Sequence, residues 1–253
     1  MIFSTPNLVA LLLIVFSIAS LYFLTRRYVD RSGVGLRNIK AYEKLQKQAV
    51  KAMASGRSIH FSPGRGSLSK ATNPTSLAGL SGLQRITEDA SSSDKPPLVS
   101  AGDGTLFMTA RDVIRGGYEH SGRAKAYESQ KSQFIAADNS PMAFGAGVSD
   151  ILNQGEHGSS IIMGHIGSEL ALMAEAAERK HQDQIIGSDN LAALAVAVSA
   201  TEDVLMGEEL YAAAAYLQEE PAHIASLQLQ DILRILVALG ILIAAIVSLF
   251  PRT

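Results

Sequence analysis

The chain has 253 residues, a formal net charge of −2 and 47% hydrophobic residues. This composition excludes an intrinsically disordered protein, and the near-neutral charge argues against a nucleic-acid partner. Cysteine is absent, which excludes disulfide bonds, thiol nucleophiles and cysteine-bearing zinc sites. The charges are uneven, however. Nine Lys and Arg lie between Arg26 and Arg57, whereas nine Asp and Glu and no Lys or Arg lie between His181 and Leu233.

The first predicted element is an N-terminal transmembrane helix within residues 1–25. Residues 8–24 carry no charge, and with their apolar flank they approach the ~20 residues that a bilayer core requires. A cleaved signal peptide is the alternative interpretation. The MIFSTPN start lacks the positive charge of such peptides, which favours an uncleaved anchor.

Residues 26–57 are predicted to form a basic juxtamembrane helical arm, with helical spacing over residues 36–55. Its cations either lie on anionic lipid headgroups, where each is worth about 1 kcal/mol, or form an ordinary solvated face. The predicted membrane-surface residues are Arg26, Arg27, Arg31, Arg37 and Lys40.

Residues 58–220 are predicted to fold as a cytoplasmic α/β domain. An extended piece near residues 59–61 precedes a helix that Thr75 or Ser76 would cap. From residue 97 onward, a short apolar run, a small or polar turn and an amphipathic helix follow one another four times, the last helix covering residues 189–205. Such alternation predicts a mainly parallel sheet covered on both faces, hence a Rossmann-like three-layer α/β fold.

The turns after the apolar runs hold the candidate ligand-binding residues, because ligands gather at the carboxyl ends of parallel strands. Backbone N–H groups at a helix start favour an anion, so the turn at residues 164–168 is able to hold a phosphate. The complete dinucleotide and P-loop fingerprints are missing, and the same residue types also serve as helix caps and turns. The candidates are Asp138, Asn139, Gly164, His165, Ser168, Asp189 and Asn190.

No catalytic residue, metal site or cofactor is predicted from the sequence. The six histidines are dispersed without HxxxH or HExxH spacing, and a GxSxG nucleophile elbow is absent. Glu208 and Glu209 are predicted to begin a helix, where the positive end of the helix dipole accounts for them. Residues 221–253 are predicted to form a long helix that starts at Pro221 and contains the C-terminal transmembrane segment.

Three stretches carry a resemblance to a known family: GRSIHFSPGRGSLSKATNPTSLAGLSGLQRI, GEELYAAAAYL and QDILRILVALGILI. With them the chain resembles an uncharacterised family of bacterial two-anchor membrane proteins, known as a domain of unknown function. The resemblance implies a bacterial origin and no residue roles. Because basic residues follow the first span and none precedes it, we expect a bacterial inner-membrane protein with both termini outside and a cytoplasmic middle.

The leading hypothesis from the sequence is a non-enzymatic, membrane-anchored scaffold whose α/β domain forms a homo-oligomer or docks a further protein. The opposite charges of the arm and of the C-terminal half can steer copies together. Alanine-rich helices fit such an interface, although they equally fit tight packing within one domain. The alternatives are a membrane-tethered sensor or enzyme that binds a nucleotide or other anionic metabolite at the strand ends, and an accessory subunit of a transporter.

Overall fold

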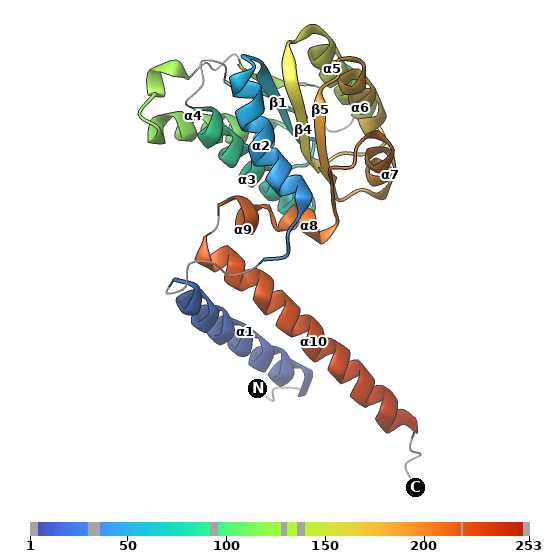
Figure 1. The fold of residues 1–253 in the computed structure, drawn as a ribbon. Helices are drawn as coiled ribbons and strands as arrows, with labels where there is room; N and C mark the ends of the chain where they lie inside the picture. Colours follow the sequence, from blue (N-terminus) through green and yellow to red (C-terminus); the bar gives the residue numbers. More distant parts are fainter. Residues whose placement is uncertain are drawn as a thin grey trace. The chain divides into compact units, whose positions relative to one another are not determined.

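The structure is a computed structural model of the chain that describes residues 5–29, 36–91, 96–127, 131–135, 140–218 and 220–249 (Figure 1). By their internal contacts, the residues fall into two compact units. Residues 37–218 make an α/β unit, and the two terminal segments make a helical unit. Among the residues proposed from the sequence, Arg31, Asp138 and Asn139 lie outside the described ranges.

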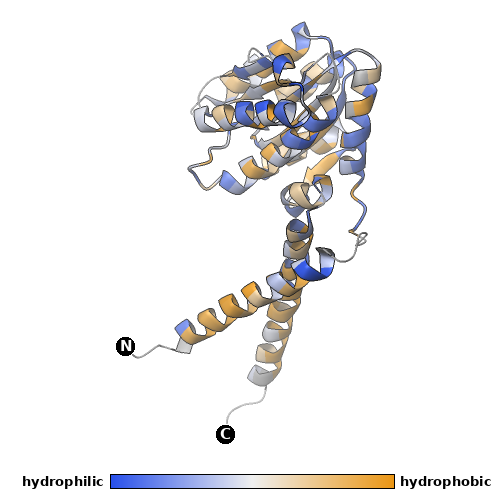
Figure 2. Cartoon of the chain, turned by 90° about the vertical axis from the view of Figure 1, so that its left-hand side faces the viewer, coloured by the Kyte–Doolittle hydropathy of each residue, from blue (hydrophilic) through white to orange (hydrophobic). Residues whose placement is uncertain are grey.

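The helical unit contains α1 (Thr5–Val29) and α10 (Pro221–Leu249), which pack against each other. Both helices are long and apolar enough to cross a bilayer, and Figure 2 shows that they consist largely of hydrophobic residues. As predicted, α10 begins at Pro221, where a proline needs no N–H partner in the first helical turn.

Six strands of the described chain form one sheet in the order β3-β2-β1-β4-β5-β6, and every neighbouring pair is parallel. The chain proceeds from β1 through β2 to β3 at one edge, and then returns to β4 and proceeds through β5 to β6 at the other edge. The strand order therefore reverses between β1 and β4, and this position is the switch point of the sheet. The predicted Rossmann-like parallel fold is confirmed. The strands are β1 (Ser58–Gly64), β2 (Leu98–Ala101), β3 (Ser132–Phe134), β4 (His157–His165), β5 (Asp183–Ser188) and β6 (Val204–Met206).

Helices cover both faces of this sheet. Neighbouring residues of β4 point to opposite faces, so Ile161 packs in one core cluster and Ile162 in the other. Side chains of α2 (Lys40–Ala54), α3 (Asn73–Ala90), α4 (Gly104–His120), α8 (Glu208–Tyr211) and α9 (Ala213–Leu217) share the first cluster. The second contains side chains of α5 (Pro141–Gln154), α6 (Leu170–Arg179) and α7 (Leu191–Ala200).

The central strand β1 contains polar residues in its interior, unlike the uniformly apolar runs that the sequence indicated as strands. His60 is completely buried, and its Nε2 lies 2.9 Å from Ser100 Oγ while its Nδ1 lies 3.4 Å from Ser160 Oγ. Pro63 lacks an N–H, and the ladder shifts register around it. Hydrogen bonds between strands thus replace apolar packing at this position.

The prediction of a helix over residues 189–205 is wrong in its last part. Helix α7 ends at Ala200, and Val204–Met206 forms the edge strand β6. Thr201 Oγ1 donates a hydrogen bond of 3.0 Å to Gln184 O, and Val204 pairs with Ile186. Pairing with β5 therefore overrides the helical periodicity.

Helix α2 is part of the α/β unit, where it buries Tyr42 and Leu45. Its basic residues reach the acidic C-terminal half of the same chain. Lys44 Nζ lies 2.8 Å from Asp203 Oδ1, and Lys51 Nζ lies 2.6 Å from Asp183 Oδ2. Arg37, just before the helix, forms an ion pair with Glu209. The charge asymmetry seen in the sequence is thus at least partly satisfied within one chain.

Candidate functional site

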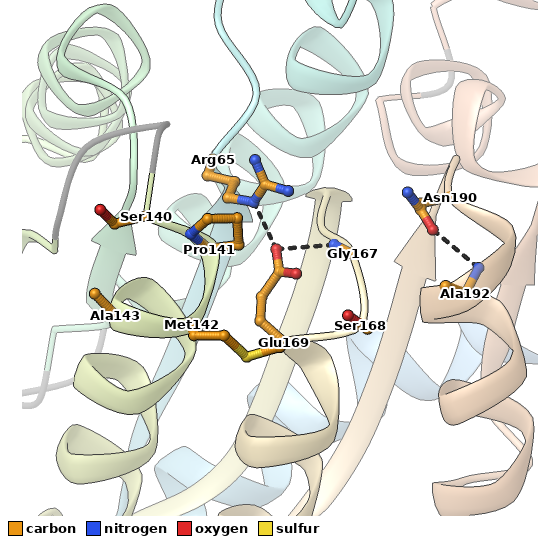
Figure 3. Close-up of a pocket in the computed structure, with 10 residues that line it drawn as sticks. All are labelled: Arg65, Ser140, Pro141, Met142, Ala143, Gly167, Ser168, Glu169, Asn190 and Ala192. Atoms are coloured by element: carbon orange, nitrogen blue, oxygen red, sulfur yellow. Dashed lines mark hydrogen bonds and ion pairs between the residues drawn. The ribbon is translucent and has the colours of Figure 1, made fainter.

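A cavity of about 500 Å³ lies beside the carboxyl ends of β1, β4 and β5, next to the switch point of the sheet (Figure 3). Pockets for small metabolites typically have volumes of about 300–1,000 Å³. Loops and helix starts that are distant in the sequence provide its walls. The lining residues are Arg65, Ser140, Pro141, Met142, Ala143, Gly167, Ser168, Glu169, Asn190 and Ala192.

The starts of three described helices meet at this cavity. Pro141 begins α5, Ser168 and Glu169 precede α6, and Asn190 precedes α7. The first turn of a helix carries a partial positive charge of roughly half an elementary charge. In α7, the N–H groups of Ala192 and Ala193 already donate to Asn190 Oδ1. The convergence of the three helix starts makes the cavity favourable for an anionic group.

One ion pair lies in the wall of the cavity, between the loop after β1 and the loop after β4. Arg65 Nε donates a hydrogen bond of 2.6 Å to Glu169 Oε1, which also accepts one of 2.9 Å from Gly167 N. The Glu169 side chain is 2% exposed. Burial by itself would raise the pKa of Glu169, but hydrogen bonds from Arg65 and Gly167 lower the pKa below its ordinary value. Glu169 is therefore an ionised carboxylate, and Arg65 balances its charge.

Gly164 and Asn190 have structural roles that explain their residue types. A Cβ atom on Gly164 would lie 1.9 Å from Pro63 O, so this glycine allows β1 and β4 to approach each other. Asn190 caps α7. Its Oδ1 accepts a hydrogen bond of 2.9 Å from Ala192 N (Figure 3) and one of 3.4 Å from Ala193 N. In contrast, Ser140 makes no side-chain cap bond to α5.

A second polar cluster lies on the other side of the end of β4, toward α3. His165 Nδ1 lies 2.8 Å from Asp189 Oδ1, and Asp189 Oδ2 accepts a hydrogen bond of 2.8 Å from Thr75 Oγ1. Thr75 Oγ1 in turn lies 3.1 Å from Tyr211 Oη. Residues from β4, from the turn after β5, and from α3 and α8 thus form one hydrogen-bonded chain.

The structure brings some of the candidates together and separates others. Ser168 and Asn190 line the cavity, whereas His165 and Asp189 form the second cluster. Neither Arg65 nor Glu169 was among the candidates from the sequence. Both lie in glycine-containing turns, Arg65 in GRG and Glu169 in GHIGSE. The sequence predicts Thr75 or Ser76 as the cap of the helix that follows. The structure instead starts α3 at Asn73, which leaves the Thr75 hydroxyl to bind Asp189.

The predicted membrane-surface residues have different surroundings. Arg26 lies with its guanidinium carbon 5.2 Å from the centre of the Tyr22 ring, and Arg27 is exposed. Lys40 is exposed at the start of α2, whereas Arg37 binds Glu209. Within the described ranges, no three His, Asp or Glu side chains lie close enough to hold a metal ion.

Comparisons with known proteins identify a family for the whole chain. No curated protein and no solved structure matches it. A family model described as "Domain of unknown function (DUF6754)" matches residues 1–253. Because this match extends from the first residue to the last, the chain belongs to the DUF6754 family, a domain of unknown function.

Proposed function

We propose that the protein is a membrane-anchored ligand-binding protein whose α/β unit holds a small anionic metabolite, such as a nucleotide or a sugar phosphate. The observation that carries this proposal is the cavity of about 500 Å³ at the switch point, where the starts of α5, α6 and α7 meet. Doubly wound parallel sheets bind their ligands at this position.

The electrostatics of the cavity support an anion. Arg65 and Glu169 form an ion pair with each other, and the helix starts add partial positive charges. The hydroxyl groups of Ser140 and Ser168 line the same wall and are suited to bind phosphate or sugar oxygens. The ligand class is therefore small, polar and negatively charged.

The two terminal helices provide the anchors in this proposal. We place the protein in the bacterial inner membrane with both termini outside and the α/β unit in the cytoplasm. Supporting this, the exposed Arg26 and Arg27 lie at the C-terminal end of the first candidate span, and positively charged residues favour the cytoplasmic side.

A substitution at Ala192 tests the ligand site. Ala192 is exposed and lines the cavity at the first turn of α7. We expect Ala192→Glu to leave the fold intact, because an acidic residue suits a helix start, and to weaken binding of an anion by repulsion. In the detergent-purified protein, a ligand at 100 times its Kd stabilises by about 2.7 kcal/mol, which raises Tm by roughly 5–10 °C.

The measurement is a thermal-shift series with ATP, GTP, glucose 6-phosphate and inorganic phosphate. The matched control is Ala195→Glu, which places the same charge on an exposed position of α7 that does not line the cavity. We expect the shift to persist in the control and to shrink in Ala192→Glu. Equal shifts in both variants, or the absence of a shift in the wild type, would contradict the proposal.

A second candidate function is assembly with further copies through α7, and one observation favours it. The helix sequence LAALAVAVSA has no charged residue, and Leu191 and Val198 are 83% and 59% exposed. Exposed apolar surface of this kind often marks an interaction site. The charge argument for assembly is weaker, because Lys44 and Lys51 bind Asp203 and Asp183 of their own chain.

Native mass spectrometry of the detergent-purified protein tests this second function. If α7 forms the interface, we expect Val198→Lys to shift the assembly toward the monomer, because a buried unpaired ammonium is costly. Val50→Lys, at an exposed position of α2, is the control and should leave the mass unchanged. A monomeric wild-type protein, or an assembly that Val198→Lys leaves intact, would exclude α7 as an interface.

A further inference from the structure

The cluster around His165 is partly exposed to solvent. His165 is the last residue of β4, at the carboxyl edge of the sheet, and its side chain is 24% exposed. The chain of hydrogen bonds behind it runs through Asp189 and Thr75 to Tyr211, which is 45% exposed. This cluster does not line the cavity between Arg65 and α7, so it is a separate feature of the same edge.

The protonation of Asp189 determines the tautomer of His165. Burial alone would raise the pKa of Asp189, but the hydrogen bonds from His165 and Thr75 lower the pKa below its ordinary value. An ionised carboxylate only accepts hydrogen bonds, so Nδ1 of His165 must carry the proton. In the neutral ring, Nε2 then has a free lone pair. Among the described residues, no hydrogen bond engages that nitrogen.

A purely structural tie between β4 and β5 does not account for this arrangement. The two strands are already joined by backbone pairing from Ser159 and Asp183 to Met163 and Gly187. Thr75 belongs to a different element, α3. It donates a hydrogen bond to Oδ2 of Asp189, the oxygen that does not face His165, and so orients the carboxylate. A base, its orienting carboxylate and a third group that fixes the carboxylate are the arrangement that acid–base catalysis requires.

We infer that His165 is a general base that removes the proton from an O–H group of a substrate. Nε2 forms an N–H bond with the proton as the O–H bond breaks, and the bonding electrons remain on the oxygen. The positive charge of the imidazolium is stabilised by Asp189, which keeps its own negative charge. The substrate class is a hydroxyl compound that reaches the α3 side of the strand end. This inference adds an activity to the proposed binding function and does not depend on it.

Chemical modification with diethyl pyrocarbonate tests the inference, because this reagent reacts with the free lone pair of a neutral imidazole. The full chain in detergent is treated at pH 7, and mass spectrometry follows each histidine separately. The internal references are His120, which is exposed, and His223, whose side chain is 43% exposed and whose Nε2 lies 3.5 Å from Glu220 Oε2. We expect His165 to react faster than both, despite its lower exposure, because Asp189 orients and polarises its ring.

Two variants separate a base from a structural residue. Asp189→Asn retains the shape of the side chain and removes its charge, and we expect the His165 rate to fall by about tenfold while the reference rates stay the same. Thr75→Val removes one hydrogen bond to Asp189 and should lower the rate by a smaller factor. Circular dichroism checks that each variant folds.

Some outcomes would overturn the inference. If wild-type His165 reacts no faster than His120 and His223, its lone pair is not activated. If its rate stays constant or rises in Asp189→Asn, the carboxylate only holds the ring in place. Neither result affects the thermal-shift test of the cavity, so failure of this inference is distinguishable from failure of the proposed binding function.

Discussion

The two histidines of the central strands, His60 in β1 and His165 at the end of β4, differ in almost every physical respect. His60 is completely buried, and both ring nitrogens contact serine hydroxyls of neighbouring strands. His165 is partly exposed, and within the described ranges only its Nδ1 is engaged. The interior of the sheet uses a histidine to satisfy its own polar groups, whereas the carboxyl edge leaves one nitrogen available to a ligand.

The same contrast holds for charge. Burial of His60 disfavours the charged form of its ring and lowers its pKa to about 3, and the nearby His157 lowers this pKa further. At the carboxyl edge, in contrast, charged groups are retained and paired, as in Arg65–Glu169 and His165–Asp189. Retaining buried charge near the surface of a fold requires specific partners. The edge is therefore the part of the sheet where loss of one partner has the largest effect.

The largest effect is expected for removal of Arg65. Arg65→Met leaves the 2% exposed Glu169 carboxylate without its cation, and breaking a buried ion pair in this way costs about 3–5 kcal/mol. Chemical denaturation of the detergent-purified protein measures the loss. The control is Arg179→Met, since Arg179 forms a largely exposed pair with Glu175 on one helix, worth at most about 1 kcal/mol. Equal losses in the two variants would mean that the edge does not depend on its charges.

A smaller effect is expected from acid, through His60. The pKa of His60 is about 3 in the folded chain against an ordinary value of 6.5, so the unfolded chain takes up the proton first. The contribution of the neutral ring is complete above pH 6.5 and is lost as the pH falls toward 3. Between pH 7 and pH 5 we expect a loss of about 2 kcal/mol from this residue.

Denaturation curves at pH 7, 6 and 5 check this expectation, with His60→Gln and His120→Gln as the pair of variants. Replacing His60 should reduce the dependence on pH, whereas replacing the exposed His120 should leave it as in the wild type. His157, whose pKa burial also lowers, acts in the same direction and accounts for part of the remaining slope. An unchanged slope in His60→Gln would show that the interior tolerates the charged ring.

The architecture was predictable from the sequence because local signals and packing agree in most of the chain. Apolar runs such as SSIIMG and DQIIGS became β4 and β5, and the uncharged stretches at both ends became α1 and α10. The role of β1 was not predictable, because His60, Ser62 and Pro63 hide a central strand. Their compatibility with the sheet depends on Ser100 and Ser160, which lie far away in the sequence.

The candidate site was predictable only as a region. Parallel topology placed His165, Ser168, Asp189 and Asn190 at the carboxyl edge, which the structure confirms. The pairing within that region depends on contacts between residues far apart. Arg65 binds a glutamate 104 positions away, and Thr75 binds an aspartate 114 positions away. Neither a periodic pattern nor a local motif indicates a contact between residues so far apart in the sequence. The fold was therefore needed to distinguish the cavity from the histidine cluster.

Helix α2 begins close to the point where the α/β unit ends. The Tyr42 and Tyr216 rings stack with their centres 5.1 Å apart, and Tyr216 Oη donates a hydrogen bond of 2.6 Å to Arg37 O. The first and last segments of the α/β unit therefore meet within the unit itself. Because its two ends lie side by side, we expect the unit to tolerate insertion between other pairs of helices.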